Sequence, residues 1–126
     1  MHRSRLAGFI IDCKCDDLPG AAGFWAGALG MPSRPLPGPE GLKYMQLADP
    51  SGRLHVEVQL VDHPSRVHLD IESDDVEAEV RRLVALGAKR VRQVDRWWVL
   101  EAPTGQWFCV VPGDAAGLAA DANVWP

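Results

Sequence analysis

Apolar and polar side chains alternate along residues 66–75, RVHLDIESDD. On an extended chain the two kinds fall on opposite sides: Val67, Leu69 and Ile71 on one, and His68, Asp70 and Glu72 on the other. A period of two is typical of a strand whose one face packs on a core while the other faces solvent or a pocket. We therefore predict a strand over residues 67–72 and a second one over the similar run FIIDCKC, residues 9–15.

A helical pattern follows the later of these strands. Its apolar stripe has helical spacing and consists of Val76, Val80, Leu83 and Val84. We expect Asp74 to cap the N-terminus, with Glu77 three residues later completing a capping box. Gly87 stands where a left-handed residue ends a helix.

The stretch DDLPGAAGFWAGALG, residues 16–30, predicts another helix. It would begin at Asp17, carry Pro19 in its first turn and end at Gly30. Its three internal glycines each cost about 1 kcal/mol relative to alanine. We expect close packing on a sheet to explain them.

Two stretches carry neither pattern. Residues 31–41, MPSRPLPGPEG, hold four prolines and predict a stiff, irregular loop that is neither a helix nor an interior strand. The tail, residues 113–126, is rich in alanine without a clear period. It would either cover a sheet edge, through Trp125, or fray.

The two predicted helices belong to an internal repeat. Residues 16–30 and 74–87 both begin with two aspartates and an aliphatic residue, and both end on Ala-Leu-Gly. Each follows a predicted strand and precedes a hairpin-like turn, DPSG at 49–52 and APTG at 102–105. The chain therefore reads as two copies of a strand, a helix and several further strands.

Composition narrows the class of protein. The 126 residues suffice for one domain with its own core, and 47% hydrophobic with 24% charged residues is typical of a globular protein. A net charge of -4 without a basic stripe argues against nucleic acid, and no run approaches the roughly 18 apolar residues of a membrane span. Three cysteines without a framework spacing fit a reducing compartment, so we expect a cytoplasmic protein with no nucleic-acid or membrane partner.

The repeat resembles the vicinal oxygen chelate superfamily, which includes glyoxalase I, bleomycin-resistance proteins and extradiol dioxygenases. The motif F-[YW]-x-x-x-L-G of that superfamily reads FWAGALG at residues 24–30. The strings VHLDI, DDVEAEVRRLVALGAKRV and WVLEAPTGQWFCVV are similar to its glyoxalase-like branch. The resemblance covers roughly residues 7 to 112.

The resemblance implies an α+β fold. Two βαβββ modules would form an open, barrel-like mixed sheet around a ligand cleft, with the helices outside. Residues 1–126 would make a single glyoxalase-like domain, with module 1 at about 7–62, module 2 at about 66–112 and the C-terminal tail at 113–126. Superfamily members often form dimers, so a homodimer is expected as well.

In such a fold the alternation assigns the strand residues to two faces. The face toward the helices would hold Phe9, Ile11, Cys13, Val67, Leu69, Ile71, Phe108 and Val110. The face toward the cleft would hold Ile10, Asp12, Lys14, His68, Asp70, Glu72, Trp107 and Cys109.

Metal-dependent members of the superfamily hold a divalent cation with histidines and carboxylates on the first and last strand of each module. Seven residues before the aspartate that opens each helix stand His68 and, in the first half, Ile10, which cannot bind a metal. Four residues after each turn glycine stand Cys109 and Val56, and Glu57 is reached only by a shift of one residue. We therefore expect no cofactor; a divalent metal, if one binds, would take His68, Glu57 and Cys109 as ligands.

Without a metal, the cleft would bind a small, planar or apolar molecule. Indole rings suit such a ligand, and Trp107 shares the inward face with Cys109. Of the adjacent Trp97 and Trp98, one would face inward. The candidate ligand-binding residues are His68, Trp107, Cys109, Gln59, Glu57 and Trp98.

Three functions compete on these residues. The first is a protein that binds a small molecule without a catalytic metal. The second is a metal-dependent lyase, isomerase or dioxygenase of glyoxalase type, which the incomplete ligand set disfavours. The third is a metal-free enzyme with His68 as general acid or base and Asp70 beside it, because a nearby carboxylate can orient an imidazole.

Overall fold

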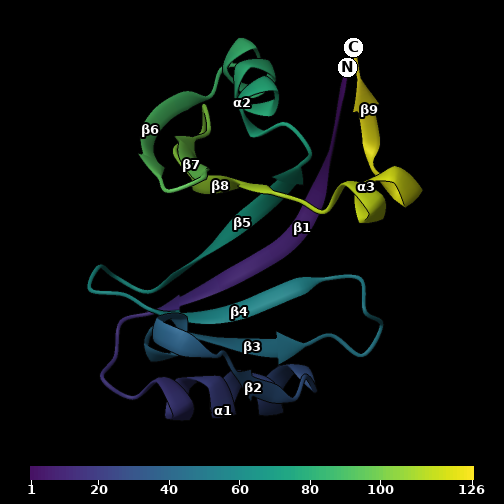
Figure 1. The fold of residues 1–126 in the computed structure, drawn as a ribbon. Helices are drawn as coiled ribbons and strands as arrows, with labels where there is room; N and C mark the ends of the chain where they lie inside the picture. The colour runs from purple at the N-terminus through teal and green to yellow at the C-terminus, as the bar shows by residue number, and fades with distance from the viewer. The chain divides into compact units, whose positions relative to one another are not determined.

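The computed structural model describes all 126 residues and divides them into two compact units. The N-terminal unit comprises Gly8–His68, and the C-terminal unit comprises Leu69–Pro126 together with Met1–Ala7. Strand β1 (His2–Cys13) and strand β5 (Arg66–Ser73) each contribute residues to both units. Figure 1 labels the elements in chain order.

The N-terminal unit is one βαβββ module. Besides β1 it contains α1 (Leu18–Leu29), β2 (Ser33–Pro35), the 3-10 helix η1 (Gly38–Leu42), β3 (Tyr44–Ala48) and β4 (His55–Leu60). The strand order is β2-β3-β4-β1, in which β1 runs parallel to β4 and the other neighbours are antiparallel. Gly8 permits a close approach of β1 to β4, because a Cβ there would lie 1.8 Å from the carbonyl oxygen of His55.

The C-terminal unit repeats this topology. Besides β5 it contains α2 (Val76–Ala85), β6 (Lys89–Val94), β7 (Trp97–Glu101), β8 (Trp107–Pro112), α3 (Ala115–Asp121) and β9 (Asn123–Trp125). The order is β6-β7-β8-β5, with β5 parallel to β8. The predicted α+β class with two βαβββ modules is therefore confirmed. None of the helices is long and apolar enough to span a membrane.

Helices α1 and α2 each cover one face of a sheet and close a core there. Around α1 the core consists of Ile11, Leu18, Ala22, Leu47, Val56 and Val58, with Phe9 and Cys13 packed against it. Around α2 it consists of Val80, Ala88, Leu100 and Val110, with Trp98 and Phe108 packed against it. The predicted helix-facing positions of β1 and β8 agree with these cores. Those of β5 do not, because Val67 and Leu69 are 57% and 50% exposed, so no helix covers them.

The helix termini follow the predicted chemistry, with one displacement. The Asp17 carboxylate accepts from the Gly20 N–H at 3.1 Å, and Gly30 ends α1 in the left-handed region at φ 67°. At α2 the cap is Asp75, which accepts from the Ala78 N–H at 3.0 Å. Asp74 instead accepts from the N–H of Arg3 at 2.7 Å, so the predicted cap was wrong by one residue.

The glycines of α1 do not serve close packing on the sheet. A Cβ at Gly23 or Gly27 would meet nothing within 4 Å. At Gly20 a Cβ would come within 2.3 Å of a carboxylate oxygen of Asp17, so this glycine makes room for the cap. The expectation that packing on the sheet explains these glycines was therefore wrong at all three positions.

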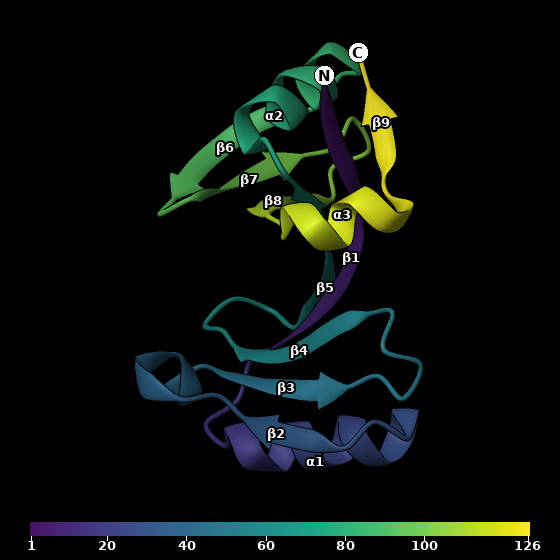
Figure 2. The ribbon, with the colours of Figure 1, turned by 45° about the vertical axis from the view of Figure 1, so that its right-hand side comes forward.

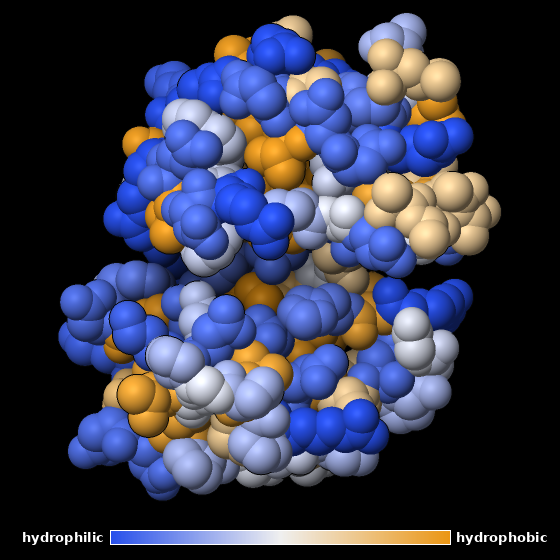
Figure 3. Space-filling view, in the orientation of Figure 1, coloured by the Kyte–Doolittle hydropathy of each residue, from blue (hydrophilic) through white to orange (hydrophobic).

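The two stretches without a pattern contain more structure than predicted. Residues 31–41 hold β2 at a sheet edge and most of η1. The tail forms α3, whose Leu118 is fully buried, and β9, which pairs with the start of β1 so that Trp125 stands opposite His2. Figure 2 shows α3 and β9 in yellow beside β1, and the alanines of α3 give a pale orange patch in Figure 3. Of the two alternatives for the tail, the covered edge is correct.

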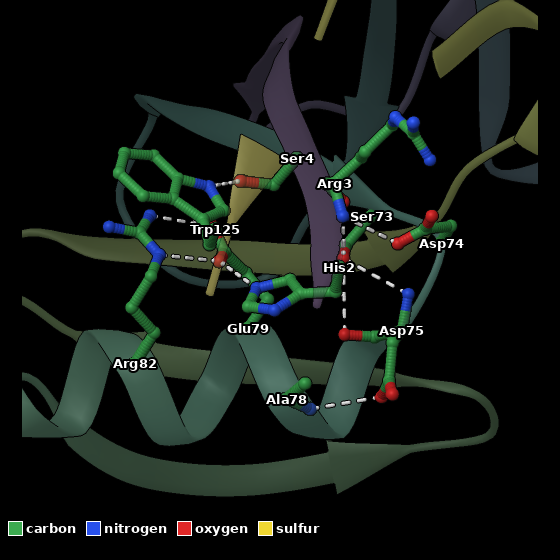
Figure 4. A network of polar contacts seen from close by, with 10 residues as sticks. All are labelled: His2, Arg3, Ser4, Ser73, Asp74, Asp75, Ala78, Glu79, Arg82 and Trp125. Carbon is green, nitrogen blue, oxygen red and sulfur yellow. Dashed lines mark hydrogen bonds and ion pairs between the residues drawn. The ribbon is translucent and has the colours of Figure 1, made fainter. Parts of the chain in front are cut away.

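A buried ion-pair network ties β1, α2 and β9 together (Figure 4). Glu79, with no exposed surface, accepts from Arg82 Nε at 2.7 Å and Nη2 at 2.8 Å, and lies 2.9 Å from His2 Nε2. The Arg82 guanidinium stacks 3.8 Å from the centroid of the Trp125 ring, and Trp125 Nε1 donates to Ser4 Oγ at 2.8 Å. The network stabilises the packing of β9 against β1 and α2.

The network also controls the charge of Glu79. Burial raises the pKa of this carboxyl, but hydrogen bonds from Arg82, Ser4 and His2 outweigh burial and lower the pKa from 4.5 to about 2. Because the folded state has the lower pKa, ionised Glu79 stabilises the fold above about pH 4.5. That contribution is lost as the pH falls toward about 2.

Replacement of Glu79 tests this linkage. Glu79→Gln is expected to lower the free energy of unfolding by about 3 kcal/mol at pH 7, because glutamine cannot form the charged hydrogen bonds. Near pH 2 the two proteins should differ by about 1 kcal/mol or less, since protonated glutamate resembles glutamine. Urea unfolding at a series of pH values measures both differences.

Glu77→Gln serves as the matched control on the same helix. Glu77 is 49% exposed and accepts from Arg90 Nη2 at 2.7 Å at the surface. We expect a loss below about 1 kcal/mol. Equal losses for the two variants at pH 7 would contradict a special role for the buried network.

Candidate functional site

The sheet face opposite α1 carries the polar side chains of the N-terminal unit. Strands β1 and β4 run side by side with Asp12 in register with Gln59 and Ile10 in register with Glu57. On the next strand Tyr44 is in register with Gln59. Since register partners in a sheet share a face, these side chains form one continuous surface.

Asp12 and His68 form the central pair of this surface. Asp12 is only 2% exposed, and its Oδ2 lies 2.8 Å from Nδ1 of the 15% exposed His68. Nε of Arg66 lies 3.8 Å from the same oxygen. The other carboxylate oxygen, Oδ1, is buried without a hydrogen-bond partner. Such an oxygen in a native fold calls for an explanation.

Gln59 and Tyr44 form a second pair next to Asp12. Gln59 Nε2 donates to the phenol oxygen of Tyr44 at 2.9 Å. Both side chains are partly buried. The surface therefore offers an imidazole, an amide and a phenol on strands of one sheet.

Glu57 lies on this polar surface as well. It is 14% exposed and its Oε1 lies 3.4 Å from Nε2 of His55. Val56, the residue reached by counting from the turn glycine, is fully buried in the core around α1.

That count failed because the two modules have turns of different length. The register partner of Asp12 is Gln59, seven residues after Gly52, whereas the register partner of Asp70 is Cys109, four residues after Gly105. The longer turn is organised by the carboxylate of Asp49. The Ser51 hydroxyl and the N–H groups of residues 51, 53 and 54 donate to it and lower the pKa of Asp49 to about 2.

The C-terminal unit has a corresponding face opposite α2. Asp70 is in register with Cys109 there, and Trp107 is in register with Glu101. Trp107 Nε1 donates to Glu101 Oε1 at 2.9 Å across the two strands. The indole is thereby held with its N–H satisfied, and the ring remains partly exposed.

A family model and solved structures place this architecture among known proteins. The family model described as "Glyoxalase-like domain" matches residues 8–111, which is most of the chain. The chain belongs to the glyoxalase-like domain family. The resemblance to the vicinal oxygen chelate superfamily is thereby confirmed. A comparison with curated protein sequences found no match.

Solved structures share the fold at low sequence identity. A hypothetical protein from Bacillus halodurans C-125 has a TM-score of 0.65 at 12% identity, over 88% of this chain and 95% of its own. A methylmalonyl-CoA epimerase in complex with methylmalonyl-CoA and NH4+ has a TM-score of 0.60 at 15% identity, over 90% and 96%. The methylmalonyl-CoA epimerase from Mycobacterium tuberculosis has a TM-score of 0.55 at 16% identity, over 91% and 93%. At these identities the likeness concerns the fold alone.

The predicted site residues of this glyoxalase-like domain divide between the units. His68, Gln59 and Glu57 lie in the N-terminal unit, and Asp70, Cys109, Trp107 and Trp98 lie in the C-terminal unit. The catalytic pairing of His68 with Asp70, and a single cleft lined by His68 and Trp107, stay predictions.

Trp98 lies on the helix-covered face of its sheet. It packs against the core around α2, is in register with the buried Val110, and has the guanidinium of Arg90 4.8 Å from its ring centroid. Its neighbour Trp97 therefore takes the opposite face. This placement removes the geometric reason for counting Trp98 among the ligand-binding residues.

Neither unit by itself supplies the donors of a metal site. Within each unit, no three side chains of His, Cys, Asp or Glu bring their donor atoms together as a cluster. Ile10, 3% exposed, occupies the position on the first strand that the resemblance assigns to a ligand. In the N-terminal unit, Nδ1 of His68 is engaged by Asp12, and Glu57 is paired with His55. The residues of one unit therefore do not fit a divalent cation, and a site with His68, Glu57 and Cys109 stays a prediction.

Sequence reasoning missed the pairing of Asp12 with His68 and the presence of Tyr44 on the polar surface. Asp12 was assigned to the correct face but not to His68, which lies 56 positions further along the chain. Its signal was a single charged residue inside the apolar run FIIDC. Tyr44, the only tyrosine of the chain, follows the proline-rich stretch and carried no signal.

Trp98 and Trp107, two of the tryptophans of the C-terminal unit, should respond differently to truncation. Trp98→Ala is expected to lower the free energy of unfolding by about 3 kcal/mol, because it leaves a cavity in the core around α2. Trp107→Ala should lower it by about 1 kcal/mol, mainly through the lost hydrogen bond to Glu101. Chemical denaturation measures both, and the reverse order would contradict the assignment of the faces.

Proposed function

We propose that this glyoxalase-like domain binds a small organic molecule on the sheet face of the N-terminal unit opposite α1. The observation that carries the proposal is the adjacency of two polar pairs, Asp12–His68 and Gln59–Tyr44, on strands of one sheet. Ligand sites characteristically combine a few convergent polar groups with partly buried surroundings. The methylmalonyl-CoA epimerase of the same fold, solved with methylmalonyl-CoA, supports a small-molecule role for the fold.

The chemistry of the surface defines the ligand class. An imidazole, an amide and a phenol exchange hydrogen bonds with hydroxyl and carbonyl groups. The aromatic ring of Tyr44 stands beside them and suits a planar ligand. We therefore propose a planar molecule with a hydroxyl or carbonyl group, bound without a catalytic metal.

A second candidate function is metal-free acid–base catalysis by His68. A carboxylate bonded to one ring nitrogen orients an imidazole for proton transfer at the other. Asp12 holds Nδ1 of His68 at 2.8 Å and so provides such a carboxylate. This bond is the specific observation that favours an enzyme.

Binding of a small panel tests the first proposal. Phenol, acetophenone and 4-hydroxyacetophenone are titrated into the 126-residue chain while backbone amide signals are followed by NMR. The largest shifts are expected at Asp12, Tyr44, Gln59 and His68. Gln59→Leu and Tyr44→Phe should each weaken binding of 4-hydroxyacetophenone by about fivefold, the value of one hydrogen bond.

Phe24→Ala provides the control for these variants. Phe24 is 66% exposed on α1, which covers the opposite face of the sheet, so binding should not change. Shifts that map to other surfaces, or that persist undiminished in both site variants, would contradict the proposal.

Proton exchange tests the second candidate. If His68 acts as a base, the methyl protons of 4-hydroxyacetophenone should exchange with deuterium in D2O faster with the protein than with buffer alone. His68→Ala should abolish the increase, and Phe24→Ala should leave it intact. Exchange that is equally fast with His68→Ala would exclude His68 as the base.

A further inference from the structure

We propose that Asp12 is the positioning residue for His68: it fixes the orientation of the ring and places its proton on Nδ1. This inference rests on the proposed function, in which His68 contacts the ligand. Nothing in the sequence pattern links the two residues, which stand on different strands. Their link is the 2.8 Å contact between Asp12 Oδ2 and His68 Nδ1.

The backbone around Asp12 is held firmly. Six consecutive register pairs join residues 8–13 of β1 to residues 55–60 of β4. On either side of Asp12, Ile11 and Cys13 pack into the core around α1. The carboxylate therefore projects from a fixed place on the opposite face, which is the requirement for orienting another side chain.

The contact determines where the imidazole carries its proton. An ionised carboxylate can only accept hydrogen bonds, so Nδ1 must be the donor. In the neutral ring the lone pair then lies on Nε2.

A purely structural role explains Asp12 poorly. The residue is 2% exposed, and its Oδ1 has no hydrogen-bond partner, an arrangement that costs stability. An apolar side chain in its place would avoid this cost, as Ile10 does two residues earlier on the same face. The cost is understandable if the carboxylate serves His68.

The two modules are alike at the position of Asp12 but differ at the position of His68. Asp12 and Asp70 stand five residues before the helix caps Asp17 and Asp75, so they are equivalent in the two modules. Counting in the same way makes Ile10 the equivalent of His68. Both modules therefore have an aspartate at the position of Asp12, but only the second module has a histidine at the position of His68.

The test uses the full chain with 15N-labelled histidine and needs no ligand. The nitrogen shifts of His68, identified by their loss in His68→Ala, are measured at a pH where the ring is neutral. In the unmodified protein Nδ1 should carry the proton. Asp12→Asn, which has nearly the same shape, should move the proton to Nε2, because the asparagine amide can donate to Nδ1.

Two further variants keep the test decisive. Asp12→Leu removes every hydrogen-bonding atom at position 12, so Nδ1 loses this acceptor and its nitrogen shift should change from that of the unmodified protein. Asp16→Asn removes the same charge at an exposed position and should leave the His68 shifts unchanged. Nitrogen shifts that are identical in the unmodified protein, Asp12→Asn and Asp12→Leu would overturn the proposal.

Binding separates this inference from the function on which it rests. Asp12→Asn and His68→Ala should each weaken the binding of 4-hydroxyacetophenone by about tenfold. This factor corresponds to the loss of one charge-assisted contact. If His68→Ala binds normally, the proposed function fails, whatever the tautomer. If His68→Ala loses binding while Asp12→Asn keeps both binding and the Nδ1 proton, only the positioning role fails.

Discussion

The parallel pairing of the first and last strand in each module is the constraint on which the rest of the structure depends. It joins β1 to β4 and β5 to β8, and the helix that follows each first strand must cross over one face of the sheet to make it possible. The crossing helix buries one set of alternating side chains. In each unit the other set lies on the opposite face, with Asp12 beside Gln59 in the N-terminal unit and Asp70 beside Cys109 in the C-terminal unit.

Buried polar groups on this scaffold have two different consequences. Glu79 is fully satisfied by Arg82 and His2, so its charge strengthens the fold and ties the C-terminal strand to α2. Asp12 is satisfied through one oxygen only, and its buried Oδ1, which has no hydrogen-bond partner, costs stability. The contrast supports a structural role for the first carboxylate and a functional role for the second.

Local rules predicted well those features that depend on neighbours in the chain. The helix that begins after Asp17 and ends at Gly30 follows from capping and glycine chemistry, which act within one turn. The same rules misplaced the cap of α2, because Asp74 accepts a hydrogen bond from the N–H of Arg3, 71 positions away in the chain. Counting from turn glycines failed for Gln59, since turns tolerate insertions that strand pairing does not.

By itself, the sequence determined the duplicated βαβββ organisation, the family, and the face of β1 on which Asp12 lies, because periodicity and repeats are written in consecutive residues. Only the tertiary structure decided that Asp12 holds His68, that Gln59 holds Tyr44, and that Trp98 belongs to the core. Register between strands distant in sequence depends on turn length and on the packing of the helices above them. No window of the chain contains that information.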